Sequence, residues 1–284
     1  MKVLVTGVRG QLGYDVVKEL AQRGIEAVGA DIDDFDITNS EETLKFITDL
    51  KPDAVIHCAA YTAVDRAEDD AETCRKVNVT GSENIAKAAA AVGAKIVYIS
   101  TDYVYEGEGD TPFEVTDKVA PLSVYGKTKL EGENAVRAAT DKYFIVRTSW
   151  VFGKNGNNFI KTMLRVGADH PVLTVVDDQI GSPTYTVDLA RLVCDMIMTE
   201  KYGIYHGTNE NFCSWAEFAS EIFKEAGMKT EVKFVSTEEY GISKAKRPHN
   251  SRLSKKNLDD AGFKRLPSWQ DALKRYLKEI KVVK

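Results

Sequence analysis

Two residues of the stretch VYGKTKLEGE, Tyr125 and Lys129, have the types and the spacing for acid–base chemistry. Positions four apart lie on one face of a helix, where their side chains can reach each other. A lysine in that place can favour the phenolate form of a tyrosine, whose unperturbed pKa is about 10. The alternative is an ordinary charged helix face. A cofactor site nearby would favour the catalytic interpretation.

The N-terminal segment KVLVTGVRGQLGYDVVKELAQRG predicts a strand, a glycine turn and a helix in succession. The apolar run Val3–Val5 precedes the turn, and Gly24 marks the end of the helix. The glycines follow the spacing G-x-x-G-x-x-G, one residue wider in the first gap than the usual dinucleotide fingerprint. A turn without side chains lets a pyrophosphate approach the backbone, and the helix N-terminus offers unpaired N–H groups. We therefore interpret Gly7, Gly10 and Gly13 as part of a cofactor site.

A second predicted strand, IEAVGAD, ends in Asp31, close to the position where an acidic residue meets the adenosine ribose in dinucleotide-binding folds. A carboxylate there accepts hydrogen bonds from the ribose hydroxyls and repels a 2′-phosphate, which favours NAD(H). Arg9, inside the glycine turn, favours NADP(H) because a guanidinium could bind that phosphate. We expect NAD(H) or NADP(H) as the cofactor, with NAD(H) preferred.

Alternating strands and helices through about residue 150 predict an α/β fold with a Rossmann-like, doubly wound parallel sheet. A helix over about Ser40–Leu50 precedes the apolar strand Ala54–Ile56, which is typical of a strand buried on both faces. Small residues follow that strand and leave room for a ligand at the carboxyl edge of the sheet; the competing explanation is a tight packing turn.

The same edge should gather the groups needed for catalysis. A further strand, KIVYIS, ends in Ser100 and Thr101, and the next helix starts after Pro121. In a parallel sheet the hydroxyl of Thr101, the phenol of Tyr125 and the amine of Lys129 would then meet where a nicotinamide ring should lie. This context favours the catalytic interpretation of the tyrosine and lysine.

The composition narrows the class of protein. The chain has 284 residues and a formal net charge of −5, which argues against nucleic acid or an anionic membrane as the main partner. Four scattered cysteines form no C-x-x-C pair, so neither a zinc site nor a disulfide framework is indicated. The N-terminus runs straight from a strand into the glycine turn, and no apolar run approaches 18 residues. We expect a cytoplasmic protein.

The second half of the chain predicts a smaller α/β lobe that binds substrate. We place the dinucleotide-binding domain at residues 1–153, with added segments from about 172–200, and the interleaved substrate lobe at residues 154–284. The amphipathic segment WAEFASEIFKEAG predicts a helix whose aromatic residues belong to the core. The basic segment SKAKRPHNSRLSKKN is either a solvated loop or a diphosphate site, in which Arg247 could bind two oxygens. Trp150, after the strand IVRTS, is either core or a pocket wall.

Several separate motifs resemble a known family. TGVRGQLG, STDYVY and YGKTK resemble the extended short-chain dehydrogenase/reductase superfamily. NVTGSENIAKAA, RTSWVFG, NFIKTML, DDQIGSPTY and RPHNSRL narrow the resemblance to the dTDP-4-dehydrorhamnose reductase family over nearly the whole chain. The resemblance implies NAD(P)H-dependent reduction of the C4 keto group of dTDP-4-dehydro-L-rhamnose to dTDP-L-rhamnose, with Tyr125 as the proton donor.

The resemblance also implies roles for individual residues. The catalytic group comprises Tyr125, Lys129 and Thr101. The cofactor would contact, besides Tyr125 and Lys129, a set of residues from the first half of the chain: Gly7, Gly10, Gln11, Leu12, Gly13, Asp31, Asp36, Ile37, Ala59, Ala60, Tyr61, Thr62 and Asn78. The nucleotide sugar would contact Val64, Thr101, Asp102, Tyr103, Trp150 and Arg247.

Other outcomes stay open at this stage. A homodimer is one of them. In some family members dimerisation is linked to magnesium through glutamates at the subunit interface. Here the residue after Tyr14 is Asp15, and we expect no metal site. The same scaffold could also carry another nucleotide-sugar 4-reductase, an epimerase or a non-catalytic regulatory subunit. The joint presence of Thr101, Tyr125 and Lys129 favours an enzyme over a binding subunit.

Overall fold

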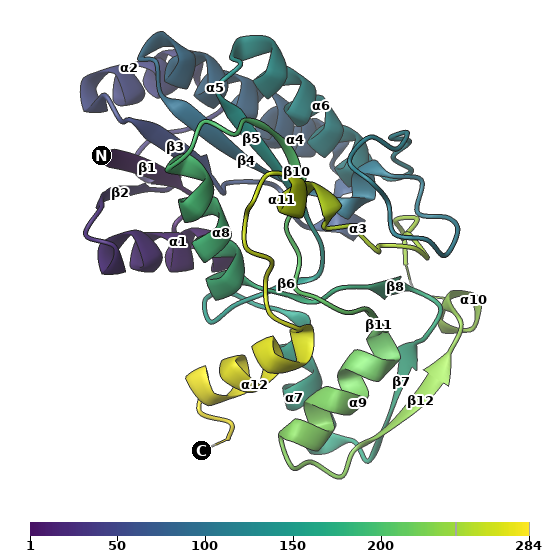
Figure 1. Cartoon of the computed structure of the whole chain (residues 1–284). Coiled ribbons are helices and arrows are strands. Elements are labelled where there is room, and N and C mark those ends of the chain that lie inside the picture. Colours follow the sequence, from purple (N-terminus) through teal and green to yellow (C-terminus); the bar gives the residue numbers. More distant parts are fainter. Residues whose placement is uncertain (242, 284) are drawn as a thin grey trace.

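A computed structural model describes residues 1–241 and 243–283. Its centre is a parallel sheet with the strand order β10-β5-β4-β3-β1-β2 (Figure 1). The strands of this sheet are β1 (Lys2–Thr6), β2 (Glu26–Ala30), β3 (Ala54–His57), β4 (Lys95–Thr101), β5 (Tyr143–Thr148) and β10 (Gly203–His206). The doubly wound α/β fold expected from the sequence is confirmed.

Helices cover both faces of this sheet (Figure 1). One face packs against α1 (Gln11–Gln22) and α8 (Thr186–Ile197), and the other packs against α2 (Ser40–Leu50), α5 (Ser82–Ala91) and α6 (Val124–Ala139). Alternate residues of a strand point to opposite faces. In β1, accordingly, Val3 and Val5 belong to the first of these cores and Leu4 to the second.

The strand order creates the crevice in which a ligand can lie. From β1 the chain passes to β2 on one side, and then crosses to β3 on the other side of β1. Connections therefore diverge at the carboxyl ends of β1 and β3, and ligands of open α/β sheets bind at such a switch point. Thr6 pairs with His57 in the register of these two strands, so the glycine turn and the segment after β3 leave the sheet side by side.

The small lobe lies below the sheet in Figure 1 and has its own apolar core. Short strand pairs frame it: β7 with β12, β8 with β11, and β6 with β9. Their bounds are β6 (Val151–Phe152), β7 (Val172–Val176), β8 (Ile180–Gly181), β9 (Thr184–Tyr185), β11 (Cys213–Ser214) and β12 (Glu231–Val235). The helices of the lobe are α7 (Phe159–Asp169), α9 (Trp215–Glu225), α10 (Thr237–Tyr240) and α12 (Trp269–Glu279).

The chain interleaves these two parts. After the small-lobe elements β6 to β9, it returns to the sheet for α8 and β10 before it enters the small lobe again. The domain boundaries given above, with the first break after residue 153, stay a prediction.

Short-range sequence patterns predicted most of the helices and strands on which the candidate site lies. The helix at Ser40–Leu50 and the helices in the segments TVDLARLVCDMIM and WAEFASEIFKEAG are confirmed. The segment VNVTGSENIAKAAAAVG differs, because it begins as a π-helical turn, η1 (Lys76–Gly81), before α5 continues. The remaining short elements are α3 (Val64–Ala67), α4 (Ala71–Arg75), α11 (Lys256–Asp260) and the 3₁₀ turn η2 (Asp102–Val104).

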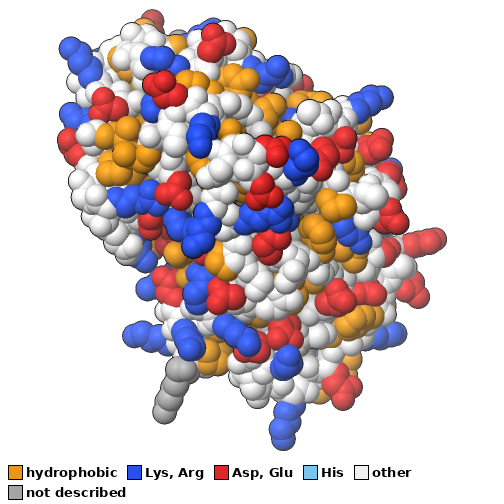
Figure 2. Space-filling model, viewed as in Figure 1, with side chains coloured by type: hydrophobic (Ala, Val, Ile, Leu, Met, Phe, Trp, Pro, Cys, Tyr) orange, Lys and Arg blue, Asp and Glu red, His pale blue; other side chains and the backbone are white. Residues whose placement is uncertain are grey.

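Acidic and basic side chains are interspersed over the face shown in Figure 2. Within residues 1–241 and 243–283, no helix combines the length and the apolar character that a membrane crossing requires.

Candidate active site

The glycine turn between β1 and α1 packs directly against the end of β3. Gly7 has a φ of +72°, and a Cβ on it would lie 2.7 Å from the backbone nitrogen of Ala59. A Cβ on Gly13 would lie 2.4 Å from the carbonyl oxygen of Gly7. Both approaches are too close for any side chain, so the turn depends on glycine at these positions.

The start of α1 is suited to an anion. Its N-cap residue is Gly10, which offers no side-chain oxygen to the first turn, and that turn carries no acidic residue. The first N–H groups of a helix have no partner inside the helix and carry the positive end of its dipole. A diphosphate therefore fits at this end of α1.

A cavity of about 450 Å³ opens beside this turn and continues along the end of β2. Of the predicted cofactor residues, Gly7, Gly10, Asp31, Asp36, Ile37, Ala59 and Ala60 line it. Arg9, Phe35, Thr38 and Val77 line it as well. Apolar side chains, a carboxylate and an open helix N-terminus suit an adenosine diphosphate, so these residues fit a dinucleotide.

Asp31 and Arg9 are both fixed at the mouth of this cavity. The carboxylate of Asp31 accepts hydrogen bonds from the backbone N–H groups of Arg9, at 2.9 Å, and of Ile32, at 2.9 Å. The guanidinium of Arg9 forms an ion pair with Asp33 instead of pointing freely into the cavity. The two groups that could select the cofactor thus lie next to each other.

The other predicted cofactor residues are not part of the lining of this cavity. Gln11 accepts hydrogen bonds from the N–H of Gly153 and the amide of Asn158, and Leu12 belongs to the core. Asn78, in the π-helical turn, accepts a hydrogen bond from the N–H of Tyr61 at 2.8 Å and donates one to its carbonyl at 3.1 Å. Thr62 is exposed.

Tyr125 lies where β4 ends and α6 begins. Ser123 caps α6 by accepting a hydrogen bond from the N–H of Gly126, which places Tyr125 in the first turn. Its ring meets the ring of Tyr103 edge to face, with centroids 5.6 Å apart, and Thr101 is a second neighbour. The structure therefore brings the predicted phenol and hydroxyl together.

The pKa of Tyr125 differs from the expectation. Burial raises the pKa of this phenol well above its usual value of 10, and the neighbouring Thr101 hydroxyl only partly opposes that rise. Lys129 was expected to lower it, but its ammonium lies 4.1 Å from the ring centroid of Tyr98, toward β4. Burial lowers the pKa of Lys129 itself to about 7. The expectation of a lowered tyrosine pKa was wrong because desolvation by burial is the largest influence on this phenol, and Lys129 is not among the groups that lower its pKa.

Asp102, directly after β4, links the end of that strand to the C-terminal part of the chain. It is 3% exposed, and its carboxylate accepts hydrogen bonds from the hydroxyls of Thr101, at 2.9 Å, and Ser251, at 2.5 Å. Burial raises its pKa to about 6, although both hydroxyls oppose the rise. Asp102 can therefore hold Thr101 in place and can change its charge just below neutral pH.

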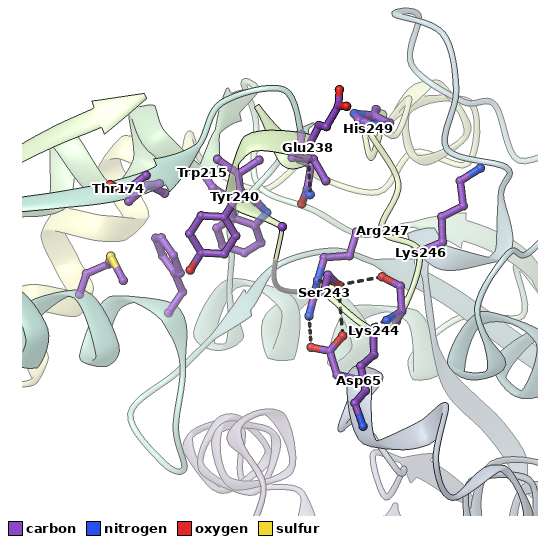
Figure 3. A pocket seen from close by; sticks show the side chains of 18 residues that line it. Asp65, Thr174, Trp215, Glu238, Tyr240, Ser243, Lys244, Lys246, Arg247 and His249 are labelled. Atoms are coloured by element: carbon purple, nitrogen blue, oxygen red, sulfur yellow. Dashed lines mark hydrogen bonds and ion pairs between the residues drawn. The ribbon is translucent and has the colours of Figure 1, made fainter. Parts of the chain in front are cut away.

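A second cavity, of about 860 Å³, lies between the small lobe and α3 (Figure 3). Arg247 lines it and points toward Asp65, with which it forms an ion pair at 2.5 Å. The same guanidinium donates a hydrogen bond to the hydroxyl of Tyr103 at 3.2 Å, which links this cavity to the ring beside Tyr125. Val64, which was predicted to contact the nucleotide sugar, is the first residue of α3 and precedes Asp65.

Aromatic residues form the far wall of the second cavity. Trp215 packs on the core of the small lobe, as expected, and it also lines the cavity, where it stacks on Trp150 with ring centroids 3.7 Å apart. Trp150 has a φ of +49°, and Gly181 leaves space for its indole, since a Cβ there would lie 2.8 Å from the ring. Asp65 and Trp215 were not predicted as cavity residues because neither belongs to a recognisable ligand-binding motif.

Comparisons with known proteins identify the family of the chain. The sequence model of the family described as "RmlD substrate binding domain" matches residues 1–282. The dTDP-4-dehydrorhamnose reductase of Aggregatibacter actinomycetemcomitans is 41% identical and aligns with 96% of this chain and 97% of its own.

Two solved structures extend the similarity to the whole fold. The dTDP-4-dehydrorhamnose reductase ortholog of Clostridium acetobutylicum is 46% identical, with a TM-score of 0.97 and coverage of 99% of this chain and 100% of its own. The dTDP-4-dehydrorhamnose reductase of Bacillus anthracis, solved in complex with NADP, is 44% identical, with a TM-score of 0.95 and coverage of 98% and 100%. The chain therefore belongs to the RmlD family, which includes the dTDP-4-dehydrorhamnose reductases.

Proposed function

We propose that this protein reduces the C4 carbonyl of dTDP-4-dehydro-L-rhamnose to the alcohol of dTDP-L-rhamnose, with NADH or NADPH as the reductant. The observation that carries the proposal is the position of the Tyr125 phenol. It lies beside Thr101, at the carboxyl end of β4, and its ring packs on Tyr103, whose hydroxyl accepts a hydrogen bond from Arg247 of the second cavity. Membership of the RmlD family supports the choice of substrate.

The chemistry requires a proton at the carbonyl oxygen. A bound reduced nicotinamide supplies the hydride to C4. Tyr125 donates its hydroxyl proton to the oxygen on which negative charge develops, and general acid catalysis of this kind contributes about 10²–10⁴-fold. A proton donor must be protonated beforehand, and the raised pKa of Tyr125 keeps the phenol neutral throughout the physiological range. Thr101 orients the phenol, and Lys129 binds the nicotinamide ribose.

The nucleotide of the substrate fits the second cavity. Aromatic side chains (Phe159, Trp215, Tyr240) offer surfaces for a base, and Arg247 lies on the side that faces Tyr103. A planar guanidinium suits a diphosphate because it can donate two parallel hydrogen bonds. In this arrangement Arg247 holds the diphosphate while the sugar ring extends toward Tyr125.

For the cofactor we propose NAD(H) over NADP(H). The carboxylate of Asp31 is held at the cavity mouth by the backbone of the glycine turn, and Arg9 is engaged with Asp33. The Bacillus anthracis relative has been solved with NADP, so use of both nucleotides is expected, with the lower KM for NADH. We further propose a cytoplasmic enzyme. A homodimer stays a prediction, which light scattering can check.

The direct test is the assay of wild type and Tyr125→Phe with dTDP-4-dehydro-L-rhamnose, followed by absorbance of NADH or NADPH and by product analysis. We expect one reduced cofactor to be consumed for each dTDP-L-rhamnose formed, which an epimerase or a binding subunit would not show. Loss of one oxygen in Tyr125→Phe should lower kcat by at least about 10²-fold and leave cofactor binding intact.

Tyr103→Phe is the matched control, because it removes the same atom from the neighbouring ring. It should change the KM for the sugar, through its contact with Arg247, while kcat stays within about tenfold. Near-normal turnover by Tyr125→Phe would show that the proton comes from another group.

A further inference from the structure

A fully buried ion pair joins the catalytic helix to the sheet. Glu133 in α6 accepts two hydrogen bonds from the guanidinium of Arg147 in β5, at 2.7 and 2.9 Å. The two side chains are 2% and 3% exposed. The hydroxyl of Ser100 in β4 donates a further hydrogen bond to the same carboxylate at 2.5 Å. Three elements of the Rossmann half therefore meet at one carboxylate.

Arg147 is itself held on its other side. It donates a hydrogen bond to the hydroxyl of Tyr105 at 2.7 Å, and that hydroxyl is also bonded to Nε2 of His206 in β10, at 2.7 Å. Nδ1 of His206 is bonded to the carbonyl of Ser254 at 2.8 Å. Because each member is fixed by others, the carboxylate of Glu133 has one position relative to the sheet.

This carboxylate shares a helix face with the catalytic residues. Tyr125, Lys129 and Glu133 follow one another at intervals of four, so they lie in a row along α6. The strand β4 faces the same row, since Tyr98 lies under the ammonium of Lys129 and Ser100 binds Glu133. Tyr98 and Ser100 are two apart in the strand, so their side chains point to the same face.

Stability alone is a weak reason for such a pair. Well-packed apolar residues in place of a buried ion pair are often as stable or more stable. From the buried geometry we propose that Glu133, clamped by Arg147 and Ser100, is a positioning residue for Lys129: one helical turn further along α6, its carboxylate keeps the lysine charged on the face that packs on Tyr98. The inference rests on the proposed function, in which the ammonium of Lys129 binds the nicotinamide ribose.

The charges around Lys129 support this assignment. The titratable groups that face it are Glu133 on its own helix, Tyr98 on β4, His57 on β3, Cys58 after β3 and Cys74 on α4. Burial raises the pKa values of Tyr98, Cys58 and Cys74 and lowers that of His57 to about 3, so all four are neutral near pH 7. Among the described groups this leaves Glu133, whose charge is partly balanced by its partner Arg147 on β5, to oppose the desolvation that lowers the pKa of Lys129 to about 7.

The test is the pH profile of Glu133→Gln. If Lys129 must be charged, kcat/KM for NADH falls as pH rises through the pKa of Lys129. Removing the carboxylate should move this alkaline limb down by about 1 pH unit, with about a tenfold loss of kcat/KM above the limb. Glu133→Asp, which restores the charge, should return most of the shift. The KM for the sugar should change less than about threefold.

Glu131→Gln is the matched control. It makes the same substitution in the same helix, and Glu131 forms an exposed ion pair with Arg75. Its profile should coincide with that of wild type. If Glu133→Gln fails to fold, the double variant Glu133→Leu/Arg147→Met replaces the pair by apolar residues of similar volume. It should shift the limb in the same direction by a smaller amount, because the charge of Arg147 is lost as well.

A direct measurement separates this inference from the proposed function. NMR titration of ¹³Cε-labelled lysine, with Lys129 assigned through Lys129→Met, reports the pKa of Lys129 without any substrate. A pKa lowered in Glu133→Gln but not in Glu131→Gln supports the positioning role even if the sugar is not reduced. An unchanged Lys129 pKa in a folded Glu133→Gln or double variant overturns it.

Discussion

The glycine turn allows a sharp test of the cofactor site through Gly13→Ala. Gly13 lies inside α1, where alanine is normally favoured over glycine by about 1 kcal/mol. Here the added Cβ would meet the carbonyl oxygen of Gly7 at 2.4 Å and its carbonyl carbon at 2.8 Å. Ordinary contact therefore requires the turn and the helix to separate by about 1 Å. Gly7 already abuts the backbone of Ala59, so the turn cannot retreat toward β3.

The expected magnitudes follow from this geometry. Overpacking costs about 1–3 kcal/mol, and the helix propensity of alanine offsets about 1 kcal/mol of it, which leaves a net loss of about 0–2 kcal/mol in the free energy of unfolding. The effect on function should be larger, because a displacement of about 1 Å in a positioning element can lower the rate by about 10²-fold. We expect kcat/KM for NADH to fall by about that factor while the protein stays folded.

The assay combines thermal unfolding with NADH titration by fluorescence. Gly24→Ala is the control, because Gly24 follows the end of the same helix with a φ of +68°, and a Cβ on it would have no atom within 4 Å. That variant should lose about 1–2 kcal/mol of stability and keep its affinity for NADH. NADH affinity within threefold of wild type in Gly13→Ala would refute the reasoning, because the turn would then have accommodated a backbone clash without moving.

Three further predictions concern recognition and pH. Asp31→Asn should raise the ratio of kcat/KM for NADPH to that for NADH by about tenfold, because it removes a repulsion of about 1–2 kcal/mol between a carboxylate and a 2′-phosphate; steady-state kinetics with both nucleotides check this. Arg247→Ala should raise the KM for the nucleotide sugar more than the KM for NADH. The control is Lys256→Ala in the same basic segment, which should change neither KM because Lys256 is paired with Asp260 outside the second cavity. An unchanged sugar KM in Arg247→Ala would contradict the assignment of Arg247 to the diphosphate. The value of kcat/KM for the sugar should fall as pH drops through about 6, because Asp102 then gains a proton and no longer accepts hydrogen bonds from both Thr101 and Ser251. Asp102→Asn should abolish this decrease at acid pH.

Local sequence signals predicted the scaffold well because they act over a few residues. Asn39 caps α2 by accepting from the N–H groups of Glu41 and Glu42, and Gly24 ends the first helical segment, so these boundaries are visible in the sequence. The glycine spacing likewise predicted the turn that packs on β3. The π-helical turn at Lys76–Gly81 was not predicted, because it depends on how Asn78 reaches both Tyr61 and α6.

Features of the site that depend on residues far apart in the sequence could not be predicted. The spacing of Tyr125 and Lys129 placed them on one helix face, but it could not show that Lys129 points at Tyr98. Trp215 has helical periodicity with core residues, and only the stack on Trp150 turns it toward the second cavity. The pairing of Asp65 with Arg247 joins residues 182 positions apart, which no local pattern records.

Burial has opposite consequences for the pKa values of the two central groups, Tyr125 and Lys129. It raises the pKa of Tyr125, so the proton donor is already loaded at neutral pH and needs no assistance from the lysine. It lowers the pKa of Lys129 to about 7, so the ammonium loses its proton near neutral pH. A neutral amine would bind the ribose hydroxyls less strongly and would contribute no positive field at the reacting oxygen. The protonation state of Lys129, supported by the buried carboxylate of Glu133, should therefore control the rate at neutral pH, while Tyr125 supplies the proton.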